Sequence, residues 1–224
     1  MNTKPILHRD DPKAEPLIGN IKVTRDDWLN VAMDVLISDG VDQIKVMNLA
    51  ERMAVSRSSF YWYFKSKQEL FDALLAKWQA LNTAGLIAQA ELAAPTITAA
   101  VCNVHRCVVN AELFDTALDF AVRDWARKSG KVRRMLDQSD ARRLAALRAM
   151  FARYGYDETE AETRARVLYY MQIGYDLAQL NEPLAARLSM VPHYLFVFTG
   201  VEPRKEEIEE FSAYAKHYWE GAGS

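Results

Sequence analysis

LAERMAVSRSSFYWYFKSKQEL, residues 49–70, is the stretch that decides the fold of this chain. It contains two short helical patterns separated by a turn. Leu49 faces inward from the first segment, while Phe60 and Phe64 fall on one stripe of the second. Two short helices at this spacing form a helix-turn-helix. The pattern predicts helices over about 46–53 and 57–64.

The second helix presents a second face, opposite to its buried stripe. At about 100° of rotation per residue, Ser58, Ser59 and Trp62 lie on that face. Small hydroxyl side chains let a helix approach a DNA groove closely and contact base edges or phosphates. Arg57, in the first turn, can reach a guanine edge, and the indole of Trp62 offers an apolar contact and one N–H donor. These four residues are the predicted base-reading set.

Cationic and phenolic side chains lie beside this face. Ser66 and Glu69 form a predicted capping box, which makes Lys67 the first residue of the next long helix. A cation there opposes the helix dipole by a few tenths of a kcal/mol. A phosphate docked at the same helix end makes the interaction favourable, because both the helix dipole and the Lys67 ammonium attract it. Tyr61, Tyr63 and Lys67 are therefore predicted to bind the DNA backbone.

The positive charge is local. The whole chain has a formal net charge of −2, whereas residues 45–67 hold five Lys or Arg residues against Glu51 alone. A charge run is more often a solvated face than a binding site, but this one coincides with the helix-turn-helix. Lys45, at its start, is counted with the DNA-binding residues.

The rest of the chain is predicted to be helical as well. Its 224 residues are 50% apolar, which is enough for a sizeable core. The expected fold is all-α with about nine helices, in which a three-helix bundle precedes a larger helical bundle. Pro183 and Pro192 mark an expected loop, and LFVF at 195–198 is too short and isolated to be a strand. The predicted parts are a flexible arm over 1–23 and two domains over 24–78 and 79–224.

Several other classes of protein lack support in the sequence. It contains no nucleophile elbow, zinc-protease, P-loop or dinucleotide-binding motif, so an enzyme is not expected. Cys102, His105 and Cys107 lack the paired spacing of a zinc site, and no metal or cofactor is expected. The absence of a long apolar run or signal segment favours a cytoplasmic location. The remaining alternatives are a helical protein-interaction module and an enzyme with a vestigial helix-turn-helix.

Residues 49–70 resemble the TetR family of transcriptional regulators, whose members carry a run of the form LA…GVS…TLYxYFxSKxxL. The resemblance implies a ligand-responsive regulator, with a repressor favoured. It also implies a homodimer on a pseudo-palindromic DNA operator, and a small-molecule effector that lowers DNA affinity. By the same resemblance, 24–78 is the DNA-binding domain and 79–224 the ligand-binding and dimerisation domain. The resemblance also assigns the base-facing positions to Arg57, Ser58, Ser59 and Trp62. It assigns the phosphate-contacting positions to Tyr61, Tyr63 and Lys67.

Three residues depart from the family pattern. Ala54 stands where the family usually has Gly, which costs on the order of 1 kcal/mol if that turn needs a positive φ. Lys45 replaces a capping Thr and therefore exchanges a helix cap for a charge. Trp62 stands where a polar residue is common, so the DNA sequence that it reads is not apparent.

The larger half supplies two further sets of candidates. The helices expected at 158–180 and 204–219 carry apolar residues suited to subunit packing. The predicted dimer contacts are Ala165, Tyr169, Ile173, Ile208, Phe211, Ala215 and Tyr218. The predicted ligand contacts are Cys102, His105, Phe120, Trp125, Tyr169 and Tyr175. Their aromatic content favours an apolar or amphipathic effector, although a lone histidine is more often a satisfied core residue than a ligand contact.

Overall fold

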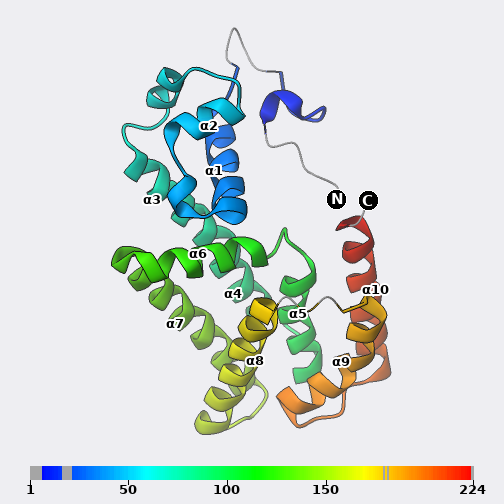
Figure 1. The fold of residues 1–224 in the computed structure, drawn as a ribbon. Coiled ribbons are helices and arrows are strands. Elements are labelled where there is room, and N and C mark those ends of the chain that lie inside the picture. The colour runs from blue at the N-terminus through cyan, green and yellow to red at the C-terminus, as the bar shows by residue number, and fades with distance from the viewer. Residues whose placement is uncertain (1–6, 17–21, 179, 181, 223–224) are drawn as a thin grey trace. The chain divides into compact units, whose positions relative to one another are not determined.

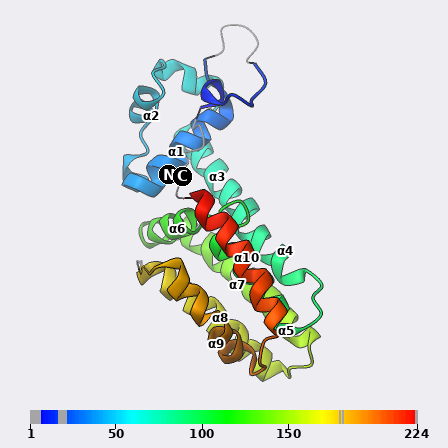
Figure 2. The same cartoon turned by 90° about the vertical axis from the view of Figure 1, so that its right-hand side faces the viewer.

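The computed structural model describes residues 7–16, 22–178, 180 and 182–222 (Figures 1 and 2). The described residues form ten α-helices and no strand, so the predicted all-α class is confirmed. The α-helices are α1 (Arg25–Asp39), α2 (Val46–Arg52), α3 (Lys67–Trp78), α4 (Ala84–Glu91), α5 (Ile97–Val109), α6 (Thr116–Lys128), α7 (Gly130–Arg153), α8 (Glu158–Ala178), α9 (Leu184–Thr199) and α10 (Lys205–Ala222). Three 3₁₀ segments, η1 (His8–Asp10), η2 (Val41–Gln43) and η3 (Arg57–Trp62), and a π-turn, η4 (Gln79–Thr83), complete the described elements.

The chain packs as two compact units. Unit 1 comprises 1–78 and 117–133, and unit 2 comprises 79–116 and 134–224. The first boundary, at 78, coincides with the end of the helix-turn-helix region expected from the sequence. The 117–133 segment, which holds most of α6, was expected to belong to the larger half, but it packs with unit 1.

Unit 1 is a small helical bundle around a continuous aromatic core. Thr24 begins α1 with a capping box: its hydroxyl accepts from the Asp27 backbone N–H at 3.1 Å, and the Asp27 carboxylate accepts from the Thr24 N–H at 2.6 Å. On α6, Trp125 packs edge-to-face on Phe71 at 4.9 Å. Asp119 of the same helix accepts a hydrogen bond from the buried indole of Trp78 at 2.8 Å. These contacts hold α6 to the end of α3.

The expected arm over 1–23 is only partly visible. Residues 1–6 and 17–21 lie outside the described residues. Leu7 is buried, and the backbone N–H of His8 donates to the carboxylate of Asp27 at the start of α1. The described part of the arm is therefore bonded to unit 1.

Unit 2 is built around α5, which packs against α4, α9 and α10. Thr96 begins α5, and its hydroxyl accepts from the Ala99 N–H at 3.1 Å. The core is largely apolar, and it also contains the fully buried Arg143. The guanidinium of this residue donates to the Tyr169 hydroxyl and the Thr83 hydroxyl, both at 3.1 Å.

Helix α9 corrects the sequence prediction, which expected a loop at Pro183 and Pro192. Pro183 is the N-cap of α9, a position where no backbone N–H is needed, and Pro192 lies inside the helix. Proline in a helix interior removes one backbone hydrogen bond, but burial of Leu195 and Phe198 stabilises the helix beyond it. The helical count therefore rises from about nine to ten among the described residues.

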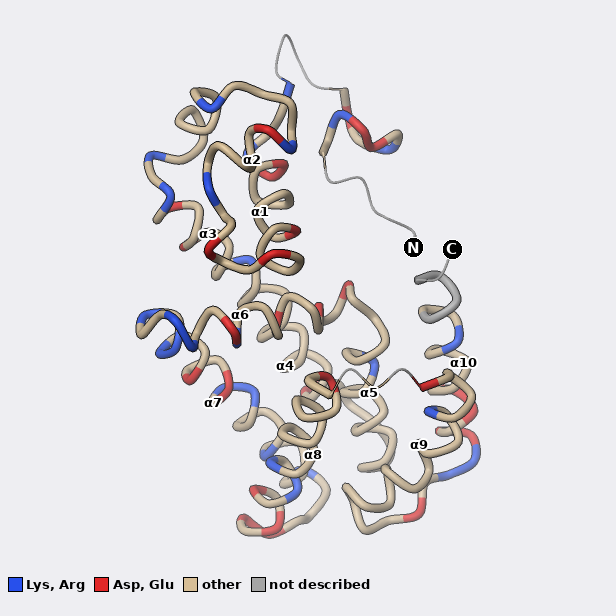
Figure 3. The backbone as a smooth tube through the Cα atoms, in the orientation of Figure 1, with Lys and Arg blue, Asp and Glu red and all other residues tan. Residues whose placement is uncertain are grey.

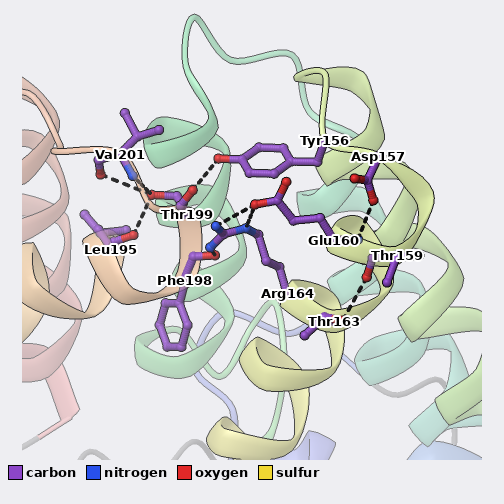
Figure 4. Close-up of polar contacts among 10 residues, drawn as sticks. All are labelled: Tyr156, Asp157, Thr159, Glu160, Thr163, Arg164, Leu195, Phe198, Thr199 and Val201. Carbon is purple, nitrogen blue, oxygen red and sulfur yellow. Dashed lines mark hydrogen bonds and ion pairs between the residues drawn. The ribbon is translucent and has the colours of Figure 1, made fainter.

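The C-terminal end of α9 is anchored to α8 by polar contacts (Figure 4). Arg164 donates to the Phe198 carbonyl at 2.8 Å and pairs with Glu160 at 2.7 Å. The Tyr156 hydroxyl donates to the Thr199 carbonyl. These bonds satisfy two carbonyls of the last turn of α9, which have no partner within the helix. They fix how α8 and α9 lie against each other.

Candidate nucleic-acid interface

The η3 segment is fixed to unit 1 by the stripe that the sequence assigned to the core. Phe60 and Phe64 are both fully buried. The ring of Phe60 lies edge-to-face on Trp28 at 5.2 Å and stacks on Phe64 at 5.4 Å. The core role of these two residues is therefore confirmed, and the opposite face of η3 is left for contact with another molecule.

Trp62 dominates that opposite face. Its side chain is 80% exposed, and Tyr61 beside it is 53% exposed. Arg57 and Ser58 are also exposed, and the Ser58 hydroxyl lies 2.9 Å from that of Ser56. Burying an indole in the protein core is strongly favourable, so the exposed Trp62 beside Tyr61 makes this face a candidate contact surface.

Two predicted contacts are placed differently. Ser59 is only 7% exposed, and its hydroxyl donates to the Ser56 carbonyl at 2.7 Å. Tyr63 is half-buried, and its hydroxyl donates to the Val23 carbonyl at 2.7 Å. A phenol has one proton to donate, so in this structure Tyr63 anchors the segment before α1 and does not offer a donor to phosphate.

The α-helix expected over 57–64 is also shorter and tighter in the structure. It is a 3₁₀ segment ending at Trp62, and the turn before it contains Ala54 with a φ of +54°. Ala54 therefore adopts the strained conformation for which the family pattern normally provides Gly. The 3₁₀ form has about three residues per turn, so side chains project at angles that differ from those of an α-helix.

Lys and Arg positions precede and follow η3 along the chain, and Figure 3 colours the backbone by charge. Lys67 begins α3, where the Ser66 hydroxyl accepts from the Glu69 N–H at 3.2 Å, so the expected cap is present. Glu69 reaches back to the Lys65 N–H at 2.8 Å rather than to that of Ser66. The Lys67 ammonium lies 4.8 Å from the ring centre of Phe71 and remains exposed.

Lys45 is the N-cap of α2 and makes no side-chain capping bond, as expected for a cation at this position. Sequence reasoning missed two other cations. Arg25, in the first turn of α1, is exposed and holds its guanidinium 4.6 Å from the ring centre of Phe64. Lys22 lines a surface hollow together with Ser56 and Trp62. Both residues lie within two positions of Thr24, the residue that caps the start of α1. That closeness in the sequence is the signal that could have identified them.

Comparison with known proteins agrees with this geometry. Residues 29–74 match the family model described as "Bacterial regulatory proteins, tetR family". Over this stretch the chain is similar to the TetR family. The tetracycline repressor protein class A from transposon 1721 of Escherichia coli is 39% identical over 54 residues, which are 24% of this chain and 25% of that protein. The uncharacterized regulator TtgW of Pseudomonas putida is 33% identical over 66 residues, which are 30% of this chain and 49% of that protein.

These sequence matches span about a quarter to a half of the curated relatives. Solved structures extend the likeness of fold over most of the chain. Salmonella enterica GusR aligns with a TM-score of 0.55 at 14% identity, covering 88% of this chain and 95% of that chain. Mycobacterium smegmatis AmtR aligns with a TM-score of 0.56 at 16% identity, covering 91% and 97%. The likeness of fold to these solved structures therefore extends over unit 2, where sequence identity is low.

The six predicted ligand contacts separate into three groups. His105 and Tyr175 line one cavity of unit 2, which is formed by α5, α8, α9, α10 and the residues before α9. Cys102 and Tyr169 are buried in the core of unit 2 and do not line it; burial raises the pKa of the Cys102 thiol to about 12. Phe120 and Trp125 belong to unit 1, because α6 packs there.

The predicted dimer contacts need a similar correction. Ala165, Tyr169, Phe211 and Ala215 are buried within the protomer, so their side chains are not available to a partner. Ile173, Ile208 and Tyr218 are half-buried. The helical pattern identified apolar faces correctly but did not show which of them the chain itself covers.

No helix among the described residues combines the length and apolar character of a membrane span.

The exposed apolar surface lies instead on α8 and α9, and we call it the α8–α9 face. Its members recur at spacings of three, four or seven residues, which place them on one side of each helix. They are Val167, Tyr170 and Leu177 on α8, and Met190, Tyr194, Val197 and Val201 on or just after α9. Val167 and Val197 line the same surface hollow, so the two stripes adjoin. Exposed apolar side chains gathered on adjoining helices make this face a candidate interaction surface.

Proposed function

We propose that this chain is a transcriptional regulator that binds duplex DNA as a homodimer and responds to a small-molecule effector. The observation that carries DNA binding is the exposure of Trp62 on η3 among Arg57, Lys67 and other cations. The tetracycline repressors among its relatives support repression as the direction of regulation. A chain with net charge −2 has no general attraction for a polyanion, so binding must come from this local surface.

Within the interface the roles divide. Arg57, Ser58 and Trp62 face the bases, with Trp62 making apolar contact with them. Tyr61, Lys67, Lys45 and Arg25 bind the phosphates and set the register. A phosphate at the start of α3 interacts with the free backbone N–H groups, the helix dipole and the Lys67 ammonium together.

The α8–α9 face is the proposed subunit contact. A two-fold dimer uses the same surface on both partners, and adjoining apolar stripes on two packed helices suit such a contact. Gly174 lies within the α8 stripe, and no atom lies within 4 Å of where its Cβ would be. A partner helix can therefore approach α8 closely at that point. The anchoring of α9 on Arg164 and Tyr156 holds the two stripes in register.

The effector is proposed to bind in unit 2 and change the affinity of unit 1 for DNA. The π-turn Gln79–Thr83 follows the boundary between the units at residue 78. The segment 117–133 gives the chain two further crossings between the units. Typical coupling free energies of about 1–3 kcal/mol correspond to changes of about 5- to 150-fold in DNA affinity.

The test of DNA binding begins with selection of bound duplexes from a random pool. Affinity for the selected duplex is then measured by fluorescence anisotropy at several salt concentrations. Lys67→Ala should weaken binding to every duplex and flatten the plot of log affinity against log salt by about one unit, because one phosphate contact is lost. Trp62→Ala should change the ranking of duplexes. Lys205→Ala, on an exposed lysine of α10, is the matched control and should change neither.

Three results bear against the proposal. Absence of duplex binding at low salt contradicts it outright. Equal losses on all sequences from Lys67→Ala and Trp62→Ala contradict the division of roles. Binding of a protein by the Trp62 surface, without steep salt dependence, supports an interaction module instead.

A further inference from the structure

The cavity of unit 2 contains a histidine whose second ring nitrogen has no hydrogen-bond partner among the described residues. The Nδ1 atom of His105 lies 3.0 Å from the Val101 carbonyl, one turn earlier in α5. A carbonyl only accepts, so Nδ1 carries the proton and Nε2 is left with its lone pair. No hydrogen bond joins Nε2 to any of the described residues, and the ring lines the cavity. The cavity therefore presents the Nε2 acceptor of His105 in a lining whose other polar side chains are Gln172, Tyr175, Glu182, Arg187 and Tyr194.

The surroundings of His105 keep the ring neutral and fixed. Its face stacks on Phe198 at 5.6 Å, and Phe211 lies edge-on at 6.3 Å. Burial lowers the pKa of His105 below its ordinary value, against the opposite effect of the Val101 hydrogen bond. At neutral pH the imidazole is therefore uncharged and remains an acceptor at Nε2.

The rest of the lining favours an uncharged ligand. The aliphatic side chains come from α5, α8 and α9, and include Val108, Met171 and Leu188. The charged residues of the lining offset each other: Glu182 accepts from the Tyr175 hydroxyl, and the Arg187 guanidinium lies 5.1 Å from the ring centre of Tyr175. A charged ligand would add an unbalanced charge to this lining, which is costly in an apolar site.

The size of the cavity limits the ligand further. Its volume is about 80 Å³. A cavity of about 150 Å³ holds benzene, so this smaller one limits the ligand to at most a single ring. The aromatic side chains of Tyr175, Tyr194 and Phe211 in the lining suit a ring of that kind.

We infer that the effector is a neutral single-ring molecule that donates one hydrogen bond to His105 Nε2, as a phenol does. The inference that this ligand is an effector rests on the proposed function. Ligand binding itself is measured without DNA. The donor matters because a buried acceptor left unpaired is costly, so ligands that lack a donor are disfavoured.

The test compares two probes of the same shape, 4-methylphenol and para-xylene, by titration calorimetry of the full chain. His105→Phe keeps an aromatic ring against Phe198 but removes the acceptor. The ratio of the affinities for the phenol and the hydrocarbon should fall by about 2- to 12-fold in this variant, because one hydrogen bond is lost. His217→Phe, on an exposed histidine of α10, is the matched control and should leave the ratio unchanged.

An independent measurement covers the case in which His105→Phe does not fold. In the parent protein the ¹⁵N resonance of His105 Nε2 should shift on adding 4-methylphenol and stay in place with para-xylene. An unchanged ratio together with an unmoved resonance overturns the inference, as does tighter binding of the anion 4-methylbenzoate. If phenol binding depends on His105 but leaves DNA affinity unchanged, the inference about the site stands and the proposed regulation fails.

Discussion

Ala54 holds a backbone conformation that alanine rarely adopts, at the turn between α2 and η3. The left-handed conformation costs a residue with a Cβ about 1–2 kcal/mol of stability. Gly avoids that cost, but its more flexible unfolded state lowers stability by about 0.4–1 kcal/mol. Ala54→Gly should therefore raise the free energy of unfolding by up to about 1 kcal/mol. Urea denaturation followed by circular dichroism measures this change.

The same substitution at Ala76 provides the comparison. Ala76 is exposed within α3, where the backbone is helical. Ala76→Gly should lower the free energy of unfolding by about 1 kcal/mol, because Gly is the poorer helix former. Opposite signs at the two positions identify relief of strain as the cause. If Ala54→Gly destabilises as much as Ala76→Gly, the strain at Ala54 is not significant.

For single residues, the sequence predicted which side of a helix is buried better than it predicted individual hydrogen bonds. Phe60 and Phe64 followed from helical spacing, and so did the exposure of Trp62. Ser59 and Tyr63 did not, because each makes a hydrogen bond to a backbone carbonyl that spacing alone cannot reveal. The Val23 carbonyl lies 40 residues away from Tyr63 in the sequence, so only the folded domain brings the two together.

Among the elements, α9 shows how a local signal can mislead. Proline is unfavourable in an isolated helix by about 3 kcal/mol, so Pro183 and Pro192 predicted a loop. Packing outweighs that preference, since α9 buries Leu195 and Phe198 in unit 2 and is bonded at its end by Arg164 and Tyr156. Neither contact is readable from the sequence before the positions of α8 and α9 are known.

The anchoring bond from Tyr156 can be tested by removing one oxygen. Tyr156→Phe leaves the Thr199 carbonyl without that donor and should lower the free energy of unfolding by about 1 kcal/mol. The ring contact with Phe151, 5.5 Å between centres, is retained, so packing is unchanged. Tyr170→Phe, on an exposed phenol of the same unit, should have no measurable effect. Equal effects on thermal unfolding would show that the Tyr156 hydrogen bond does not anchor α9.

For the molecule as a whole, the two units were only partly predictable. The boundary near residue 78 follows from where the helix-turn-helix pattern ends. The return of 117–133 to unit 1 does not, because it depends on contacts such as that of Trp125 with Phe71, which lie far apart in the sequence. The same gap explains why Phe120 and Trp125 were assigned to the ligand cavity. Helical periodicity indicates that one face of a helix is buried. Only the folded structure shows which other helix that face packs against.

The proposed dimer gives the sharpest test of the revised subunit contact. Val197 is 63% exposed at the centre of the α9 stripe, so Val197→Glu should fold normally and place a charge in the interface. Burying an unpaired carboxylate costs several kcal/mol, and the variant should therefore be monomeric by light scattering at micromolar concentration. Leu92→Glu, at an exposed apolar residue outside the α8–α9 face, should remain dimeric. Phe211→Glu should instead unfold unit 2, because Phe211 is buried beside His105. An unchanged mass for a folded Val197→Glu protein would rule out the α8–α9 face as the contact.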